Sequence, residues 1–215
     1  QLLPIPREEA ITSLLAVSEF NDDTDLLMLT QGGFIKRTRL SAFSNIRSNG
    51  LIAIGLEEGD ALTWVRLAVP GDSVLIGSQA GMTIHFRLSD EELRPLGRTA
   101  RGVRSMNLRD GDALVSMDVL PVELADRVAE SHEDGADEDE GSTASDGPWV
   151  LVASAGGLGK RVPVTQFRLQ KRAGMGLRCM KFRKECDALV ALSVLGAGEE
   201  LLLVSEKGVI VRTSA

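Results

Sequence analysis

The sequence predicts an all-β fold, built as a propeller-like array of four-stranded blades with about four repeats. Three observations lead to this prediction. Short phrases recur at intervals of about 50 residues. Each repeat holds apolar runs that are too short for helices and that end in a glycine turn. The 215 residues, of which 43% are hydrophobic, contain no long stretch with helical periodicity but suffice to bury a core.

The first phrase opens each repeat with an acidic residue, an alanine and an aliphatic residue. It occurs as Glu9-Ala10-Ile11, Asp60-Ala61-Leu62, Asp112-Ala113-Leu114 and Asp187-Ala188-Leu189. The repeats therefore span 9–59, 60–111, 112–186 and 187–215. We expect one domain over 1–215 whose blades are incomplete at the ends, because the fourth repeat stops before its third phrase.

The second phrase is an apolar run followed by Ser or Thr, two residues and a glycine. It occurs at 26–33, 74–81, 150–157 and 201–208. This pattern predicts β-hairpins, because glycine adopts the positive φ of a tight turn at little cost. Four residues beyond each glycine stands a basic or titratable side chain, namely Arg37, His85, Arg161 and Arg212.

The third phrase is a basic loop that contains glycine. It occurs at 47–50, 98–102 and 170–176. Glycine lets the backbone approach a phosphate closely while Arg and Lys neutralise its charge, so a repeated loop of this kind predicts a track of phosphate contacts. Aromatic residues make up only 4% of the chain, which favours duplex DNA over unpaired bases that need stacking partners.

The charge is distributed unevenly. The net charge is −7, yet three stretches, 36–47, 94–109 and 160–184, contain no acid and hold 18 of the 24 bases. Clustered bases of this kind are typical of a protein that binds a polyanion. We expect sequence-independent DNA binding by ten of them: Lys36, Arg37, Arg47, Arg98, Arg101, Arg104, Lys160, Arg161, Lys171 and Arg172.

An acidic insert at 123–146 lengthens the third repeat. It contains ten acids and one base, Arg127, and we expect a helical turn or two at 122–130 with disorder over the remainder. Two interpretations stay open. The insert is an inert loop, or its charge competes with phosphate for the nearby bases Lys160, Arg161, Lys171 and Arg172.

Catalytic chemistry is not indicated. The chain has no tyrosine, and Gly156–Arg161 lacks the spacing of a phosphate loop, so we interpret it as a hairpin turn. We expect His85 at a strand surface and His132 in a disordered loop, without triad or metal partners, and we expect Cys179 and Cys186 to be reduced thiols. We therefore predict no catalytic residues, no metal site, no cofactor in this chain and no membrane partner.

These repeats resemble the C-terminal domain of the DNA gyrase A subunit, with cyanobacterial or plastid versions the most similar. The resemblance rests on residues 33–38 (Gly-Phe-Ile-Lys-Arg-Thr) with 40–43 (Leu-Ser-Ala-Phe), on 99–104 (Thr-Ala-Arg-Gly-Val-Arg) and on 157–162 (Gly-Leu-Gly-Lys-Arg-Val). It implies a β-pinwheel that wraps duplex DNA on a basic rim and so supports ATP-dependent negative supercoiling. The partners would be the remaining parts of gyrase A together with the gyrase B subunit, which hold the cleavage tyrosine and the ATP and Mg²⁺ sites.

The chain departs from this family at its diagnostic heptapeptide, the gyrase A box, which reads Gln, basic, Arg, Gly, Gly, basic, Gly in the first blade. The nearest phrase, 170–176, has Ala173 and Met175 off the pattern and lies in a later blade. We therefore expect a box-bearing blade upstream of Gln1, and weak DNA binding without it.

Two alternatives remain at this stage. The first is the C-terminal domain of the topoisomerase IV counterpart of gyrase A, which lacks a strict box. The second is a propeller that binds only proteins, in which the basic loops are merely solvated. We expect a bacterial cytoplasmic location with the chromosome, with a plastid or mitochondrion as the alternative.

Overall fold

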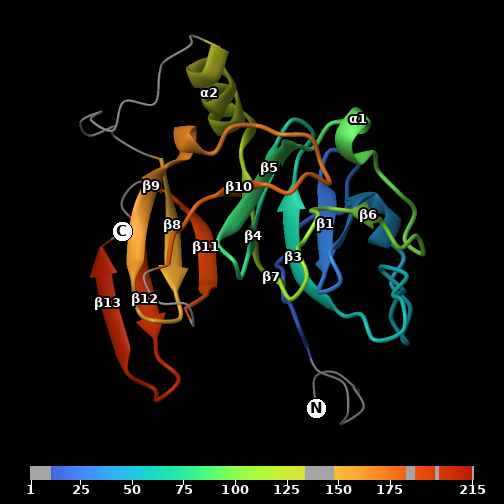
Figure 1. Ribbon diagram of the computed structural model, residues 1–215. Coiled ribbons are helices and arrows are strands. Elements are labelled where there is room, and N and C mark those ends of the chain that lie inside the picture. Colours follow the sequence, from blue (N-terminus) through green and yellow to red (C-terminus); the bar gives the residue numbers. More distant parts are fainter. Residues whose placement is uncertain (1–10, 134–147, 183–186, 197–198, 215) are drawn as a thin grey trace. The chain divides into compact units, whose positions relative to one another are not determined.

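The computed structural model describes residues 11–133, 148–182, 187–196 and 199–214 (Figure 1). The chain divides into two compact units. Unit 1 contains residues 1–70 and 88–105, and unit 2 contains residues 71–87 and 106–215. Strands dominate both units, and all pairings between the described strands are antiparallel, which confirms the all-β prediction.

Unit 1 contains one four-stranded sheet, which we call blade 1. Its strands, in the order β3-β1-β2-β6, are β3 (Leu62–Ala68), β1 (Asp25–Thr30), β2 (Phe34–Arg39) and β6 (Val103–Arg104). The short helices η1 (Leu40–Phe43) and α1 (Asp90–Leu93) lie in the connections. Ser89 caps α1 by accepting a hydrogen bond from the amide of Glu92.

Unit 2 contains the remaining sheets. Blade 2 has the order β10-β5-β4-β7, with β10 (Leu177–Arg178), β5 (Met82–Arg87), β4 (Ser73–Ser78) and β7 (Leu114–Leu120). Blade 3 has the order β11-β8-β9, with β11 (Leu189–Leu195), β8 (Trp149–Ser154) and β9 (Gly159–Pro163). Blade 4 is the hairpin of β12 (Glu200–Val204) and β13 (Ile210–Ser214). The described residues thus give two blades of four strands, one of three and one of two.

Blades 1, 2 and 3 each combine strands from two consecutive repeats, whereas both strands of blade 4 belong to the fourth repeat. In blade 1 the hairpin β1–β2 belongs to the first repeat, whereas the outer strands β3 and β6 belong to the second. Blade 2 likewise takes β4 and β5 from the second repeat and β7 and β10 from the third. Neighbouring repeats are therefore linked by backbone hydrogen bonds as well as by packing.

The Asp-Ala phrase closes the hairpin turn of the preceding repeat. Asp60 accepts a hydrogen bond from the amide of Gly32 at 2.7 Å, Asp112 from that of Ala80 at 2.9 Å, and Asp187 from that of Gly156 at 2.8 Å. The turn glycines have the positive φ that the sequence predicts, at Gly33 (88°), Gly81 (75°), Gly157 (81°) and Gly208 (77°). In these three copies the carboxylate of the first phrase therefore fixes a turn, whereas Glu9 lies outside the described residues.

The core of unit 2 lies between blades 2 and 3. It includes Leu75 and Leu120 of blade 2 with Val150, Val152 and Leu192 of blade 3. In β8 buried and half-buried residues alternate, as expected for a strand with only one face in a core.

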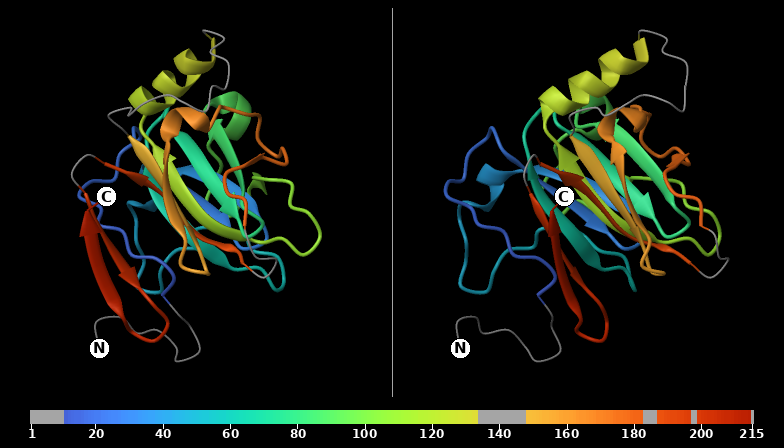
Figure 2. Two further views of the ribbon diagram at one scale, coloured as in Figure 1. Left: turned by 60° about the vertical axis from the view of Figure 1, so that its left-hand side comes forward. Right: turned by 90° about the vertical axis from the view of Figure 1, so that its left-hand side faces the viewer.

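The acidic insert begins with a helix longer than predicted. Helix α2 (Val122–Glu133) contacts η2 (Val164–Gln166) in unit 2 (Figure 2). The helical turn expected at 122–130 is confirmed, and there Ala125 and Val128 are fully buried and Asp126 forms an ion pair with Arg87. The expectation of disorder is wrong for residues 131–133, which continue the helix. His132 therefore lies on a helix, where its Nε2 is 2.7 Å from the carbonyl oxygen of Thr165. Residues 134–146 of the predicted insert lie outside the described residues.

Candidate nucleic-acid interface

The ten bases that the sequence predicts to contact DNA separate into two groups by burial. Lys36 and Arg37 are 0% and 2% exposed. The other eight are exposed or half-buried, namely Arg47, Arg98, Arg101, Arg104, Lys160, Arg161, Lys171 and Arg172. Candidate DNA contacts therefore remain at these eight residues, four in each unit, which lie in the glycine loops and on the adjacent strands.

Lys36 lies in the interior of unit 1 and does not face solvent. Its ammonium donates hydrogen bonds to the carbonyl oxygens of Ala53 at 2.5 Å, Gly97 at 3.2 Å and Arg98 at 2.5 Å. Burial, with a smaller contribution from the charge of Arg98, lowers the pKa of Lys36 to about 8. The prediction that Lys36 contacts phosphate is therefore wrong, because all three donors of the ammonium are engaged by backbone carbonyls.

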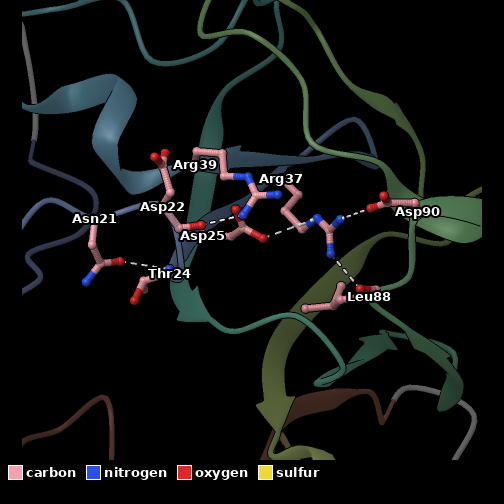
Figure 3. Close-up of polar contacts among 8 residues, drawn as sticks. All are labelled: Asn21, Asp22, Thr24, Asp25, Arg37, Arg39, Leu88 and Asp90. Carbon is pink, nitrogen blue, oxygen red and sulfur yellow. Dashed lines mark hydrogen bonds and ion pairs between the residues drawn. The ribbon is translucent and has the colours of Figure 1, made fainter.

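Arg37 is also committed to the interior of unit 1. Figure 3 shows its guanidinium between two carboxylates, with Nε 3.4 Å from Asp25 and an NH group 2.6 Å from Asp90. It also donates a hydrogen bond to the carbonyl of Leu88 at 2.5 Å. Burial raises the pKa of Asp25 and outweighs the opposing effects of Arg37 and Arg39. The prediction of a DNA contact at Arg37 is therefore also wrong.

The second basic loop, 96–102, holds its arginines at the surface of unit 1. The guanidinium of Arg101 stacks over the ring of Phe34 at 4.3 Å from the centroid and forms an ion pair with Glu57. Arg104, which pairs with Phe34 across the strands, lies 5.4 Å from the same ring. Phe34 thus orients two exposed arginines, and the carboxylate of Glu57 is a competitor of any phosphate at Arg101.

Glycine is required where this loop approaches β2. Gly102 has φ of 100°, and a Cβ there would lie 2.5 Å from the carbonyl oxygen of Ile35. Gly176 is its counterpart in the loop 170–176, with φ of 75°, and a Cβ there would lie 2.6 Å from the carbonyl oxygen of Thr83. The two loops therefore attach to their blades in the same way.

The loop 170–176 presents Lys171 at the surface, with Arg172 half-buried. Ala173 has φ of 62°, and no other non-glycine residue has a positive φ among the described residues. The gyrase A box has glycine at this position, so the backbone here keeps a conformation suited to glycine although the side chain differs. The amide of Gln170, the first residue of the loop, donates a hydrogen bond to the carbonyl of His85 at 2.7 Å.

Lys160 and Arg161 are exposed on β9 of blade 3. Arg161 lies over Trp149 with its guanidinium carbon 5.4 Å from the ring. Lys160 lines a cavity of about 110 Å³ together with Gln166, Gln170 and Arg178. These side chains supply positive charge and amide groups at the surface of unit 2, which is what a phosphate contact requires.

His85 is buried and does not lie at the strand surface that the sequence predicts. Its Nδ1 is 2.6 Å from the carbonyl oxygen of Phe167, and its Nε2 is 2.7 Å from the hydroxyl of Ser73. A carbonyl only accepts, so Nδ1 carries the proton and Nε2 accepts from Ser73. Burial lowers the pKa of His85 to about 4, although the bond to Phe167 opposes this effect. His85 is therefore neutral at pH 7.

Further exposed bases accompany the predicted set. Those described in the stretches 94–109 and 160–184 are Arg94, Arg109, Arg168, Arg178 and Lys181. All five belong to the acid-free stretches, so the charge pattern contains the signal that identifies them. Arg178 has the strongest structural support, because it forms part of β10 and lines the same cavity as Lys160.

The described residues include neither a candidate metal-binding cluster nor a candidate membrane-spanning helix. Among those residues no group of three or more His, Cys, Asp or Glu side chains is placed to hold a metal ion. No helix among them is long and apolar enough to cross a membrane. Cys179 is a free, half-buried thiol whose pKa is raised by burial.

Known proteins match this chain in four segments, each of which contains the hairpin of one blade. The family model "DNA gyrase C-terminal domain, beta-propeller" matches residues 24–68, 72–121, 148–195 and 199–215. The chain is 55% identical over its whole length to the DNA gyrase A subunit of Synechocystis, and 39% identical over 99% of its length to the chloroplastic/mitochondrial gyrase A of Arabidopsis thaliana. It spans 26% and 22% of these relatives, about a quarter of their length.

Solved structures show the same fold. The C-terminal domain of DNA topoisomerase IV gives a TM-score of 0.77 at 22% identity and the gyrase A C-terminal domain 0.75 at 24%, each over 99% of this chain and over 58% and 63% of the other. These two likenesses concern the fold alone. The topoisomerase IV alternative is not favoured, because the family model and the sequence relatives are those of gyrase A. The chain belongs to the DNA gyrase C-terminal domain family, as its repeats predict.

Proposed function

We propose that this chain binds the phosphate backbone of duplex DNA without sequence preference and bends it along the exposed bases of successive blades. The observation that carries the proposal is the recurrence of one device: a glycine loop that attaches to β2 of blade 1 or β5 of blade 2 and presents Arg or Lys at the surface. The contacts are assigned to Arg47, Arg98, Arg101, Arg104, Lys160, Arg161, Lys171 and Arg172.

In the full-length protein the chain would wrap DNA and present it for strand passage, as part of a gyrase A subunit that works with a gyrase B subunit. ATP hydrolysis and Mg²⁺ chemistry would belong to those other parts, and this chain would contribute binding without a catalytic step. The relatives are bacterial and plastid or mitochondrial. We infer the bacterial cytoplasm, with the chromosome, as the compartment.

A salt titration of DNA binding tests this proposal. Each neutralised phosphate contributes about 0.9 to the slope of log affinity against log salt, so several contacts give a slope of several units. Neutralising Lys171 and Arg172 together should lower the slope by about 1.8. A slope near zero, or binding to proteins but not to duplex DNA at low salt, would favour a protein-interaction propeller and overturn the proposal.

A further inference from the structure

Unit 1 contains two basic loops that contact each other although they are distant in sequence. The first loop covers residues 47–55 and the second loop covers residues 96–102. We propose that Lys36, which lies beneath both, is a positioning residue. It fixes the two loops to each other and so keeps the side chains of Arg98 and Arg101 in place to bind phosphate. This inference rests on the proposed function and assigns to Lys36 a role that involves no contact with DNA.

The ammonium of Lys36 joins the loops directly. It bonds the carbonyl of Ala53 in the first loop at 2.5 Å, and those of Gly97 and Arg98 in the second loop at 3.2 and 2.5 Å. An ammonium has three N–H donors and a carbonyl has none, so these three bonds use the full capacity of the group. Lysine thus suits this position because it supplies one donor to each carbonyl.

The loops touch closely around this ammonium. The amide of Gly55 donates to the carbonyl of Ala100 at 3.1 Å, and a Cβ on Gly55 would lie 2.7 Å from the carbonyl oxygen of Thr99. The amide of Leu96 donates to the carbonyl of Arg37 at 2.7 Å, which attaches the second loop to β2. Arg98 and Arg101 therefore extend from a backbone that Lys36 fixes from inside.

The same bonds explain why an apolar side chain would not serve. Without the ammonium, three partly buried carbonyls would lose their donors, and the loops would have to separate before water could replace all three bonds. Opening would move the Arg98 backbone, whose own carbonyl is one of the three acceptors. The expected consequence is weaker DNA binding through the arginines while the hairpin β1–β2 remains paired.

Lys36→Met is the decisive variant, and Lys160→Met is its matched control. Lys160 stands three residues after its turn glycine, as Lys36 does, but it is exposed. Each variant is made in the wild-type chain and in an Arg98→Ala/Arg101→Ala background. Binding to a duplex of mixed sequence is then measured as a function of salt concentration.

Lys36→Met should weaken binding roughly three- to tenfold at low salt and lower the salt slope by about 1.8, because two arginine contacts are lost together. It should cost nothing further in the Arg98→Ala/Arg101→Ala background. Lys160→Met should lower the slope by about 0.9 in both backgrounds, since it removes one independent charge. Equal effects of Lys36→Met in the two backgrounds would overturn the positioning role.

Two further measurements separate this role from a loss of folding. Trp64 in β3 reports on unit 1 once Trp149, the second of the two tryptophans, is replaced by Phe. Lys36→Met should keep the Trp64 signal and the protection of β1–β2 amides, while amide exchange of residues 96–102 becomes faster. Unchanged exchange in that loop would overturn the proposal. If Arg98→Ala/Arg101→Ala alone left affinity unchanged, the proposed DNA contacts would fail instead.

Discussion

Blade 1 and blade 3 carry the same Lys-Arg pair in the same place, with opposite outcomes. Lys36-Arg37 and Lys160-Arg161 both begin three residues after the turn glycine of their hairpin. The first pair is buried and the second is exposed. The local sequence and the hairpin geometry are shared, so neither determines what the side chains do.

The difference comes from segments that are distant in sequence. Over Lys36 and Arg37 lie the carbonyls of Gly97 and Arg98 and the carboxylate of Asp90, all from the following repeat. In the parts of the chain that the structure describes, no hydrogen bond or ion pair joins Arg161 to the fourth repeat, in which Glu200 pairs with Arg212 instead. A basic pair in this fold is therefore buried where the next repeat covers it, and exposed to solvent where it does not.

The largest expected difference between the blades is in stability, when Arg37 of blade 1 and Arg161 of blade 3 are each replaced. Arg37→Met should lower the free energy of unfolding of unit 1 by about 3–5 kcal/mol, because it leaves the buried Asp25 without its ion-pair partner. Arg161→Met should change stability by no more than about 0.5 kcal/mol, because its side chain is exposed. Urea unfolding followed by tryptophan fluorescence measures both. Equal destabilisation by the two variants would break the comparison.

Blade 2 extends the comparison to a third side chain. His85 occupies the position of Arg37 and Arg161, four residues after the turn glycine, and is buried as a neutral imidazole. Its pKa is lowered in the folded state, so the unfolded chain binds a proton first as the pH falls. The stability that His85 contributes is complete above about pH 6.5 and is lost between there and about pH 4.

This loss should amount to up to about 3 kcal/mol. His85→Gln should remove that part of the pH dependence, because glutamine offers a donor to Phe167 and an acceptor to Ser73 without titrating in this range. Urea unfolding at pH 7 and at pH 4.5, for both proteins, gives the difference directly. Identical pH profiles for the two proteins would show that position 85 does not titrate on unfolding.

Much of the fold is predictable from the sequence because its determinants are local. The apolar runs and the positive-φ glycines identify the hairpins, and the spacing of the phrases identifies the repeats. The exchange of strands between repeats is not predictable in this way. β2 pairs with β6, whose partner residues are separated by about 70 positions, and nothing in either two-residue segment signals the pairing.

The candidate site was only partly predictable for the same reason. An acid-free stretch in the sequence is not acid-free in space, since Arg37 meets Asp25 and Asp90, and Arg101 meets Glu57. Helix α2 shows an error of a different kind. The sequence predicts a helical turn only to residue 130, but the helix continues to Glu133, and Ala125 and Val128 on one side of it are buried in unit 2.

A smaller effect tests whether the hairpins themselves are equivalent. Asp60 fixes the turn before Lys36, and Asp187 fixes the turn before Lys160, each through a glycine amide. Asp60→Ala and Asp187→Ala should each cost about 1–2 kcal/mol, because each removes the acceptor of two backbone amides. Denaturant unfolding of the two variants provides the measurement. If only one of the two variants lost stability, the two hairpins would differ in structure. Cover by the next repeat would then not be the sole reason why one basic pair is buried and the other exposed.

The smallest effect concerns the acidic segment that precedes blade 3. Residues 134–146 hold six acids and no Lys or Arg, and they connect α2 to the blade that carries Lys160 and Arg161. If these acids compete with phosphate for the exposed pair, replacing 134–146 by an uncharged Gly-Ser segment of equal length should tighten DNA binding about two- to threefold at low salt. Helix α2 is kept intact, because its buried residues belong to the core.

The gain should shrink as salt increases and the Debye length falls toward about 8 Å. It should also disappear in a Lys160→Met/Arg161→Met background, because the competing charges then have no target at that pair. Blade 1 supplies the internal control. Lys36 and Arg37 are buried, so the replacement should leave the effect of Lys36→Met on DNA binding unchanged. Equal affinities of the two proteins at low salt would identify the acidic segment as a spacer. Blades 1 and 3 would then differ only in whether the next repeat covers their basic pair.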